Sequence, residues 1–212
     1  MDLRQELLRA ARRVAERGLV WASAGNISVR LAPECFLISA SGKGLGELTL
    51  QDLVMCSLSS DSCAGSRRPS TETPVHRAIY QVRPEVQAIL HFASFYATLI
   101  ACSDLPVPTD ITPEAMGYLG SVVRVPYHHP GSQALVQAVV TGVAQADVLL
   151  LNNHGPLCLG TSLPEVVLRA EALEQLCHLL ACESLSQGTL RLQRLGQETQ
   201  QDFREYLRSR GV

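Results

Sequence analysis

Apolar positions recur along the chain with two different periods, which predict helices interleaved with short strands. Spacings of three and four residues predict a first helix that follows Asp2 and ends at Gly18. Thr73 followed by Pro74 predicts the start of another helix, and similar spacings predict helices over residues 95–102, 133–144, 164–185 and 190–207. Short apolar runs between turn residues predict strands over 26–31, 35–40, 53–58, 86–92, 122–125, 148–151 and 157–159.

The order of these elements predicts the fold class. Three strands follow one another in the first third of the chain, and helices alternate with strands afterwards. Strands that are apolar throughout need cover on both faces. We therefore predict an α/β fold, a three-layer α/β/α single domain over residues 1–212 with a mixed, largely antiparallel central sheet. Residues 188–212 are expected to form a C-terminal tail helix, and residues 59–69 a mobile surface loop.

Composition narrows the class of protein. The 212 residues are 46% apolar and 18% charged, with a formal net charge of −2. This balance argues against a dedicated binder of nucleic acid or of an anionic membrane surface. No apolar run reaches the roughly 18 residues that span a bilayer, and the charged N-terminus lacks the apolar region of a secretory signal. These features predict a cytoplasmic protein.

Cysteine and lysine usage add two expectations. The seven cysteines are scattered without a C-x-x-C motif, so we expect them to be reduced and mostly buried, as in a cytosolic protein. Of the 18 cationic residues all but Lys43 are arginine. Any reaction that requires a lysine amine therefore has one candidate, and Lys43 lies in a glycine-rich loop that is expected to be exposed.

Three loops of small residues are candidates for anion binding: residues 23–26, 41–44 and 70–72. Each offers hydroxyl or amide groups and unhindered backbone N–H donors, and the last precedes a predicted helix N-terminus, which favours an anion. The chain lacks the G-x-x-x-x-G-K-[ST] motif of a nucleotide-binding loop. Each loop alone is as well explained as an ordinary turn, whereas together they would form a small phosphate cradle.

Glu72, His76, His91 and His154 form a second candidate group. His91 ends a buried strand, and His154 follows the most apolar strand. Imidazole and carboxylate groups are the ligands of a catalytic zinc or similar cation, although each histidine alone would also fit a hydrogen-bonded core position. The other histidines are expected in a solvated turn or a structural helix: His128, His129 and His178.

Taken together, these loops and histidines resemble the class II aldolase and adducin family. The motifs that carry the resemblance, in order, are Ser23–Ser28, Phe36–Gly42, Pro69–His76, His91–Thr98 and Leu151–Gly155. The resemblance implies a divalent cation, zinc, on His91 and His154, and a proton-transferring Glu72. It implies that a substrate phosphate is bound by Ser23, Gly25, Asn26, Ser41, Gly42, Ser70 and Thr71. It also implies a homotetramer with active sites at the subunit contacts.

One position departs from the family pattern. The family usually has His-x-His, and here the second histidine is replaced by Ala93. Residues two apart on a strand point the same way, so one of two paired ligands is lost, which should weaken metal binding. Glu72 would complete a site of two histidines and one carboxylate, and His128, His129 or a neighbouring subunit are alternative sources of a ligand. For the tyrosine that protonates the leaving group in aldolases, the candidates are Tyr118, Tyr127 and Tyr206.

The function implied by the resemblance is a metal-dependent lyase of the aldolase type. It would act on a small phosphorylated sugar or sugar acid through an enediolate intermediate. An epimerase or decarboxylase with the same site, and a non-catalytic adducin-like scaffold that has lost the metal, are the alternatives. A Schiff-base route would need a lysine amine with a lowered pKa, and the expected exposure of Lys43 favours the metal route.

Overall fold

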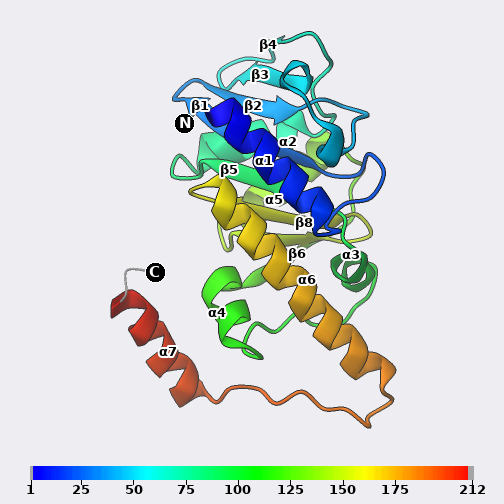
Figure 1. Cartoon of the computed structure of the whole chain (residues 1–212). Coiled ribbons are helices and arrows are strands. Elements are labelled where there is room, and N and C mark those ends of the chain that lie inside the picture. The colour runs from blue at the N-terminus through cyan, green and yellow to red at the C-terminus, as the bar shows by residue number, and fades with distance from the viewer. Residues whose placement is uncertain (1, 210–212) are drawn as a thin grey trace.

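The structure is a computed structural model that describes residues 2–209, and its centre is one eight-stranded sheet (Figure 1). The strand order is β4-β3-β2-β1-β5-β8-β7-β6. All neighbouring strands are antiparallel except β6 and β7, so the predicted mixed, largely antiparallel sheet is confirmed. The strands are β1 Asn26–Ala32, β2 Cys35–Ser39, β3 Leu53–Ser57, β4 Cys63–Ala64, β5 Ala88–His91, β6 Val122–Val125, β7 Val148–Leu151 and β8 Gly155–Gly160.

Helices cover both faces of the sheet, which confirms the three-layer prediction (Figure 1). One face packs against α1 (Leu3–Glu16), α3 (Phe95–Ala101) and α6 (Leu163–Leu185). The other face packs against α2 (Thr73–Val82) and α5 (Gln133–Val143). Strand β7 shows the reason, because alternate residues of this all-apolar strand enter the two cores.

Several elements differ from the sequence prediction. The short helix α4 (Pro113–Leu119) was not predicted, and the Thr112 side chain caps it by accepting a hydrogen bond from the Ala115 N–H at 3.1 Å. Two 3₁₀ turns lie at Leu45–Glu47 and Leu50–Asp52. The tail helix α7 spans only Gln197–Ser209 and has no buried residue. Such short or solvated segments carry little apolar periodicity, which explains the differences.

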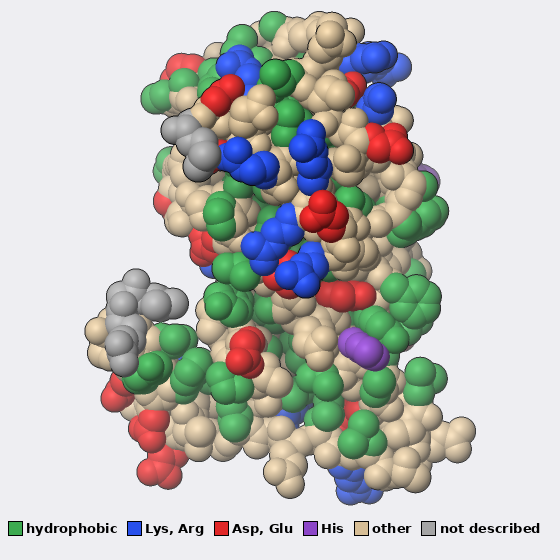
Figure 2. All heavy atoms as spheres, in the orientation of Figure 1, with side chains coloured by type: hydrophobic (Ala, Val, Ile, Leu, Met, Phe, Trp, Pro, Cys, Tyr) green, Lys and Arg blue, Asp and Glu red, His purple; other side chains and the backbone are tan. Residues whose placement is uncertain are grey.

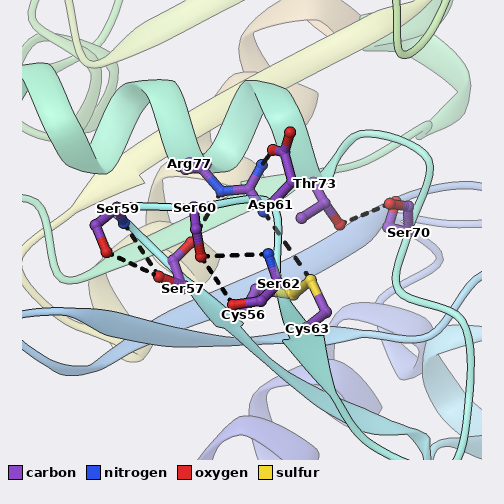
Figure 3. Close-up of a disulfide and its surroundings, with 10 residues drawn as sticks. All are labelled: Cys56, Ser57, Ser59, Ser60, Asp61, Ser62, Cys63, Ser70, Thr73 and Arg77. Carbon is purple, nitrogen blue, oxygen red and sulfur yellow. Dashed lines mark hydrogen bonds and ion pairs between the residues drawn. A yellow bond between two sulfur atoms is a disulfide. The ribbon is translucent and has the colours of Figure 1, made fainter.

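The cysteines also differ from the prediction. Cys56 and Cys63 face each other across β3 and β4 and form a disulfide (Figure 3), so the expectation that all seven are reduced is wrong for this pair. Cys102 and Cys182 are exposed rather than buried. The two cysteines are seven residues apart, and this separation indicates a disulfide only when the β3–β4 hairpin that pairs them is known. Disulfides are rare in the cytosol, so the predicted cytoplasmic location loses one of its supports.

Arg77 of α2 ties this hairpin to the helix layer. Its Nε donates to the Ser57 carbonyl at 2.8 Å, and its Nη1 donates to Asp61 Oδ1 at 2.8 Å (Figure 3). The segment predicted as a surface loop is exposed, but it contains β4 and contacts α2 through Asp61. The hairpin therefore supports the helix at whose start Glu72 lies.

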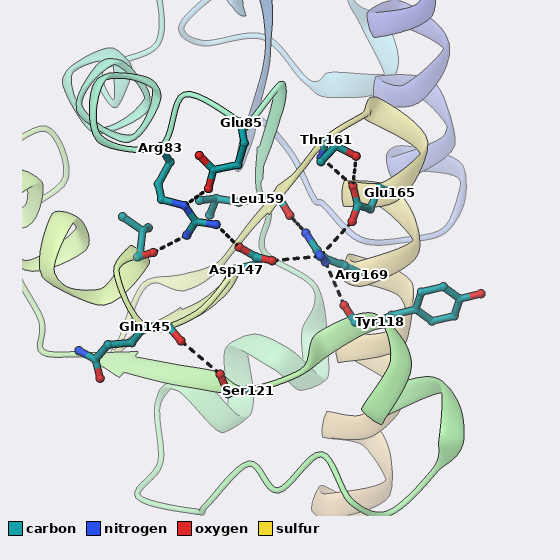
Figure 4. Close-up of polar contacts among 11 residues, drawn as sticks. Arg83, Glu85, Tyr118, Ser121, Gln145, Asp147, Leu159, Thr161, Glu165 and Arg169 are labelled. Carbon is teal, nitrogen blue, oxygen red and sulfur yellow. Dashed lines mark hydrogen bonds and ion pairs between the residues drawn. The ribbon is translucent and has the colours of Figure 1, made fainter. Parts of the chain in front are cut away.

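Ion pairs join the two helix layers at the beginning of β7 (Figure 4). Asp147 accepts from Arg83 at 2.8 Å and pairs with Arg169 of α6 at 3.1 Å. Arg169 also pairs with Glu165, one helical turn before it, at 2.9 Å. Because β7 starts at this network and ends beside the turn that carries His154, the network anchors the strand that leads to the candidate site.

The surface carries charges of both signs. Figure 2 shows basic side chains gathered over α1 with acidic side chains between them. Arg13 and Arg17 both pair with Glu171 of α6, at 3.0 and 3.3 Å. Between residues 2 and 209 no helix combines the length and apolar character that crossing a membrane requires.

Candidate active site

One cavity of about 260 Å³ brings together all ten predicted site residues. It lies where β1 begins, β5 ends, α2 begins and the β7–β8 turn passes. The predicted residues that line it are Ser23, Gly25, Asn26, Ser41, Gly42, Ser70, Thr71, Glu72, His91 and His154. The three small-residue loops and the imidazole–carboxylate group are therefore parts of one site.

Glu72 occupies the N-cap position of α2, one residue before Thr73, where the sequence predicted the helix to start. Its carboxylate does not cap the helix. Ser70 stabilises the turn instead, because its Oγ accepts the Glu72 N–H at 3.2 Å and its carbonyl accepts the Thr73 hydroxyl at 2.6 Å. The Glu72 side chain is 6% exposed and is free to face the histidines.

His91 is the last residue of β5 and the cross-strand partner of Asn26 on β1. Its Nδ1 donates to the Pro156 carbonyl at 2.9 Å. A carbonyl can only accept, so this bond defines the tautomer in which Nε2 carries the free lone pair. That Nε2 lies 3.5 Å from Glu72 Oε2. His91 is thus oriented as a metal ligand is, with its second nitrogen bound to the protein.

His154 lies in the tight turn between β7 and β8. Asn153 has a φ of 55°, and a Cβ on Gly155 would lie 2.6 Å from the Phe92 carbonyl, so the turn requires glycine there. Arg124 Nη1 donates to Asn152 Oδ1 at 3.1 Å and holds the turn from outside. His154 Nε2 lies 3.4 Å from Glu72 Oε1, and its ring is 4.6 Å from that of His91.

The electrostatics of the site favour an ionised carboxylate and a neutral imidazole. Burial raises the pKa of Glu72, but the electrostatic interactions with His91 and His154 and the Asn26 hydrogen bond outweigh it, so the pKa lies below its usual value. Burial and the neighbouring His91 lower the pKa of His154. These are the protonation states in which both residues bind metal ions.

The three side chains fit a divalent cation. One ligand atom from each of Glu72, His91 and His154 lies within 4.8 Å of the others. Within residues 2–209, Glu72 Oε1 and His154 Nδ1 are buried atoms without a hydrogen-bond partner. A buried oxygen without a partner calls for a ligand, and two imidazoles with one carboxylate are a set that zinc accepts. Ala93 lines the same cavity but supplies no ligand atom.

Asn26 has a more specific position than the sequence indicated. Its Nδ2 donates to Glu72 Oε2 at 2.8 Å, and its Oδ1 is 2.6 Å from Nε2 of the buried His76. The amide nitrogen carries a second hydrogen, and Asn26 also lines the cavity. His76 itself does not line the cavity. It was grouped from the sequence with Glu72, His91 and His154, but the structure places it behind these residues, fully buried.

Other sequence candidates lie outside the cavity lining: Lys43, Tyr118, Tyr127, His128, His129, His178 and Tyr206. Lys43 is half-buried rather than exposed. The pKa of Asp52 is lowered by the Thr49 hydrogen bond and also by the charge of Lys43. The wall residues that were not candidates from the sequence include Trp21, Thr98 and Pro130. Thr98 is the last residue of the motif His91–Thr98, and Trp21 is the one tryptophan of the chain.

Comparison with known proteins defines the class. Residues 5–181 match the model of the Class II Aldolase and Adducin N-terminal domain, so the chain belongs to the class II aldolase and adducin family. The resemblance seen in the sequence is confirmed, and the chain is an enzyme of this superfamily. This result disfavours the non-catalytic scaffold.

Individual relatives refine this picture. The chain is 32% identical to the 3-oxo-tetronate 4-phosphate decarboxylase of Escherichia coli K12 over 183 residues, covering 84% of this chain and 86% of the relative. It is 30% identical to the L-fuculose phosphate aldolase of Methanocaldococcus jannaschii over 175 residues, covering 82% and 93%. A solved structure of YgbL from Klebsiella pneumoniae, described as a putative aldolase/epimerase/decarboxylase, has a TM-score of 0.85 and 31% identity, covering 95% of this chain and 97% of that one.

Proposed function

We propose that the chain is a divalent-cation-dependent carbon–carbon lyase that cleaves a small phosphorylated sugar or sugar acid through an enediolate. The observation that carries the proposal is the joint placement of the Glu72–His91–His154 group and the three small-residue loops in one cavity of about 260 Å³. A metal-ligand set beside an anion cradle suits a substrate with a chelating end and a phosphate end.

His91 and His154, with Glu72 as the third donor, would hold the cation, and we propose zinc. A cation bound there supplies positive charge that stabilises the negative charge developing on substrate oxygens as the carbon–carbon bond breaks. The protein holds the His91 ring through the Pro156 carbonyl, so the donor geometry is present before any ligand arrives.

Glu72 is the proton-transferring residue in this proposal. Its pKa is lowered, so the carboxylate is ionised at neutral pH and able to accept a proton from a substrate hydroxyl. Oε2 is held by Asn26, whereas Oε1 has no hydrogen-bond partner. Oε1 would accept the proton, and return it to the carbanion carbon, once substrate oxygens had replaced Glu72 beside the cation.

The three loops would bind the phosphate. They contribute hydroxyls from Ser41, Ser70 and Thr71, and backbone N–H groups near Gly25 and Gly42 where no side chain obstructs approach. Because the phosphate is remote from the breaking bond, its binding energy serves to position the reacting carbon against Glu72.

Decarboxylation of a phosphorylated 3-oxo acid is the second candidate. It is favoured by the similarity to the Escherichia coli relative, which covers 84% of this chain at 32% identity. Both reactions break a carbon–carbon bond next to a carbonyl and leave the same kind of carbanion, so the same three residues would serve either.

We also propose a homotetramer with the site near a subunit contact. Trp21, which lines the cavity, is 69% exposed, and nearby Phe95 is 71% exposed. Large apolar side chains at a cavity mouth are typical of surfaces that a second subunit covers. Light scattering of the purified protein tests this, and a monomer at micromolar concentration would contradict it.

The function is tested first by metal analysis of protein purified without chelators, followed by assays of aldol cleavage and decarboxylation on phosphorylated substrates. We expect close to one divalent cation per chain and a higher Tm when zinc is added. Less than about a tenth of an equivalent, with no rise in Tm on adding zinc, cobalt or manganese, would contradict the proposal.

A further inference from the structure

A chain of hydrogen bonds continues behind Glu72, away from the cavity. Asn26 connects Glu72 to His76, at 2.8 and 2.6 Å. His76 Nδ1 lies 2.7 Å from Ser28 Oγ, and that oxygen lies 2.8 Å from the Tyr80 hydroxyl. The four residues behind Glu72 are between 0 and 6% exposed. None except Asn26 lines the cavity.

The donors and acceptors in this chain have one consistent assignment. A carboxylate only accepts, so Asn26 donates through Nδ2 and its Oδ1 must accept from His76 Nε2. The neutral imidazole then accepts at Nδ1 from Ser28. Because the Ser28 hydroxyl donates its one hydrogen to His76, the Tyr80 hydroxyl must be the donor to Ser28 Oγ.

We infer that His76, Ser28 and Tyr80 are positioning residues that act through Asn26 to hold the Glu72 carboxylate with Oε2 fixed and Oε1 directed toward His154. The inference rests on the proposed role of Glu72. Outer partners of this kind set the orientation of a ligand or base without touching the substrate.

The backbone explains why these residues meet. Asn26 and Ser28 are two apart on β1 and so point to the same face of the sheet. His76 and Tyr80 are four apart on α2 and so lie on one face of that helix. The two pairs oppose each other, and the chain of bonds zigzags between strand and helix.

Their protonation agrees with this assignment. Burial lowers the pKa of His76 to about 3, so the ring is neutral, as the assignment requires. Burial also raises the pKa of Tyr80, so its hydroxyl keeps the proton that it donates. Polar groups buried this deeply are costly unless all are paired, and here each has a partner. Apolar side chains would fill the same space without any need for hydrogen-bond partners. Core packing alone therefore does not explain why polar residues form this row of hydrogen bonds.

Matched substitutions at His76 test the inference. His76→Leu removes the donor to Asn26, whereas His76→Gln places an amide N–H near the Nε2 position. We expect kcat to fall about 10- to 100-fold and the Kd for zinc to rise about 10-fold in His76→Leu, with KM nearly unchanged. His76→Gln should recover both to within about threefold of wild type, and Tyr80→Phe, which keeps the ring, should cost about threefold in kcat.

A second measurement does not depend on activity. In ¹⁵N NMR spectra of the histidine side chains, His76 should be the Nε2–H tautomer and His91 the Nδ1–H tautomer at pH 7. The opposite tautomer for His76, or equal kcat and zinc Kd in wild type and His76→Leu, would overturn the inference. If wild type cleaves no phosphorylated substrate, the proposed function fails, and the tautomers and zinc Kd still decide the positioning role. If His76→Leu does not fold, His76→Gln and Tyr80→Phe supply the comparison.

Discussion

The two sides of the Glu72 carboxylate differ in how their polar groups are satisfied. On the inner side, Oε2 begins a chain of hydrogen bonds in which every polar side-chain atom has a partner. Within residues 2–209, four buried side-chain atoms have no hydrogen-bond partner, and three of them belong to residues that line the cavity: Glu72 Oε1, His154 Nδ1 and Thr98 Oγ1. Unpaired buried groups cost stability, so their concentration on one side marks where a ligand binds, and the paired side is rigid support.

The largest effect is expected when the cavity side loses its proton acceptor. Glu72→Gln keeps the volume and a carbonyl oxygen for Asn26, but the amide does not accept a proton at neutral pH. We expect kcat for the cleavage to fall about 10²- to 10⁴-fold, as is usual for loss of a general base. Steady-state kinetics on the metal-loaded variant measure this.

Asp52→Asn is the matched control for this change. Asp52 is another buried carboxylate, 2% exposed, and it is hydrogen-bonded to Thr49 and does not line the cavity. Its loss should alter stability and leave kcat within about threefold. A Glu72→Gln enzyme within tenfold of wild type would show that another group transfers the proton.

The cavity side was the part of the site that the sequence could predict. Its loops and histidines lie at the ends of strands, and β7 was predicted at its observed bounds because an all-apolar run of four residues has sharp ends. The inner side was not predictable. A histidine four residues after Glu72 is consistent with a ligand or with a core residue, and only the packing of α2 on β1 shows that His76 faces Asn26.

The remaining fold differences have similar causes. Helix α4 has seven residues and includes Gly117, so its apolar stripe is too short to detect. The Cys56–Cys63 disulfide depends on the pairing of β3 with β4, a two-residue strand in a serine-rich segment. Local patterns thus predicted the layers of the fold, and contacts between distant segments determined what the patterns left open.

A second prediction adds a donor to the cavity side. Ala93 is 7% exposed and lines the cavity beside His91. Ala93→His should lower the Kd for zinc about tenfold, equivalent to about 1.4 kcal/mol, because a third neutral nitrogen reaches the cation. Competition titration with a chelator measures it, and Ala93→Leu controls for bulk. If the histidine and leucine variants bind zinc equally, the cation lies elsewhere.

The buried His76 on the inner side of Glu72 should affect how the stability of the protein depends on pH. The pKa of His76 is about 3 in the folded chain, against 6.5 for a free histidine. Between these values the unfolded chain binds one more proton than the folded chain. The contribution of His76 to the free energy of unfolding is therefore at its maximum above pH 6.5 and decreases as the pH drops toward 3. The contribution of one group is at most about 1.4 kcal/mol per pH unit.

Urea unfolding at pH 7, 6 and 5 measures this slope in wild type and in His76→Gln. Glutamine does not titrate, so the variant should lose less stability on acidification. His154, whose pKa is also lowered, contributes to both proteins and cancels in the difference. Parallel curves would mean that the His76 ring takes up its proton in the folded state.

The smallest effect is expected in the phosphate loops. Ser41 is exposed, lines the cavity, and its hydroxyl has no hydrogen bond to other described residues. Ser41→Ala should raise KM for the phosphorylated substrate about fivefold and leave kcat unchanged, because the contact exists equally in the ground and transition states. The matched control is Lys43→Gln in the same loop. Lys43 does not line the cavity, so its loss should change KM less than about twofold. If Lys43→Gln raised KM more than Ser41→Ala, the lysine charge rather than the loop would hold the phosphate.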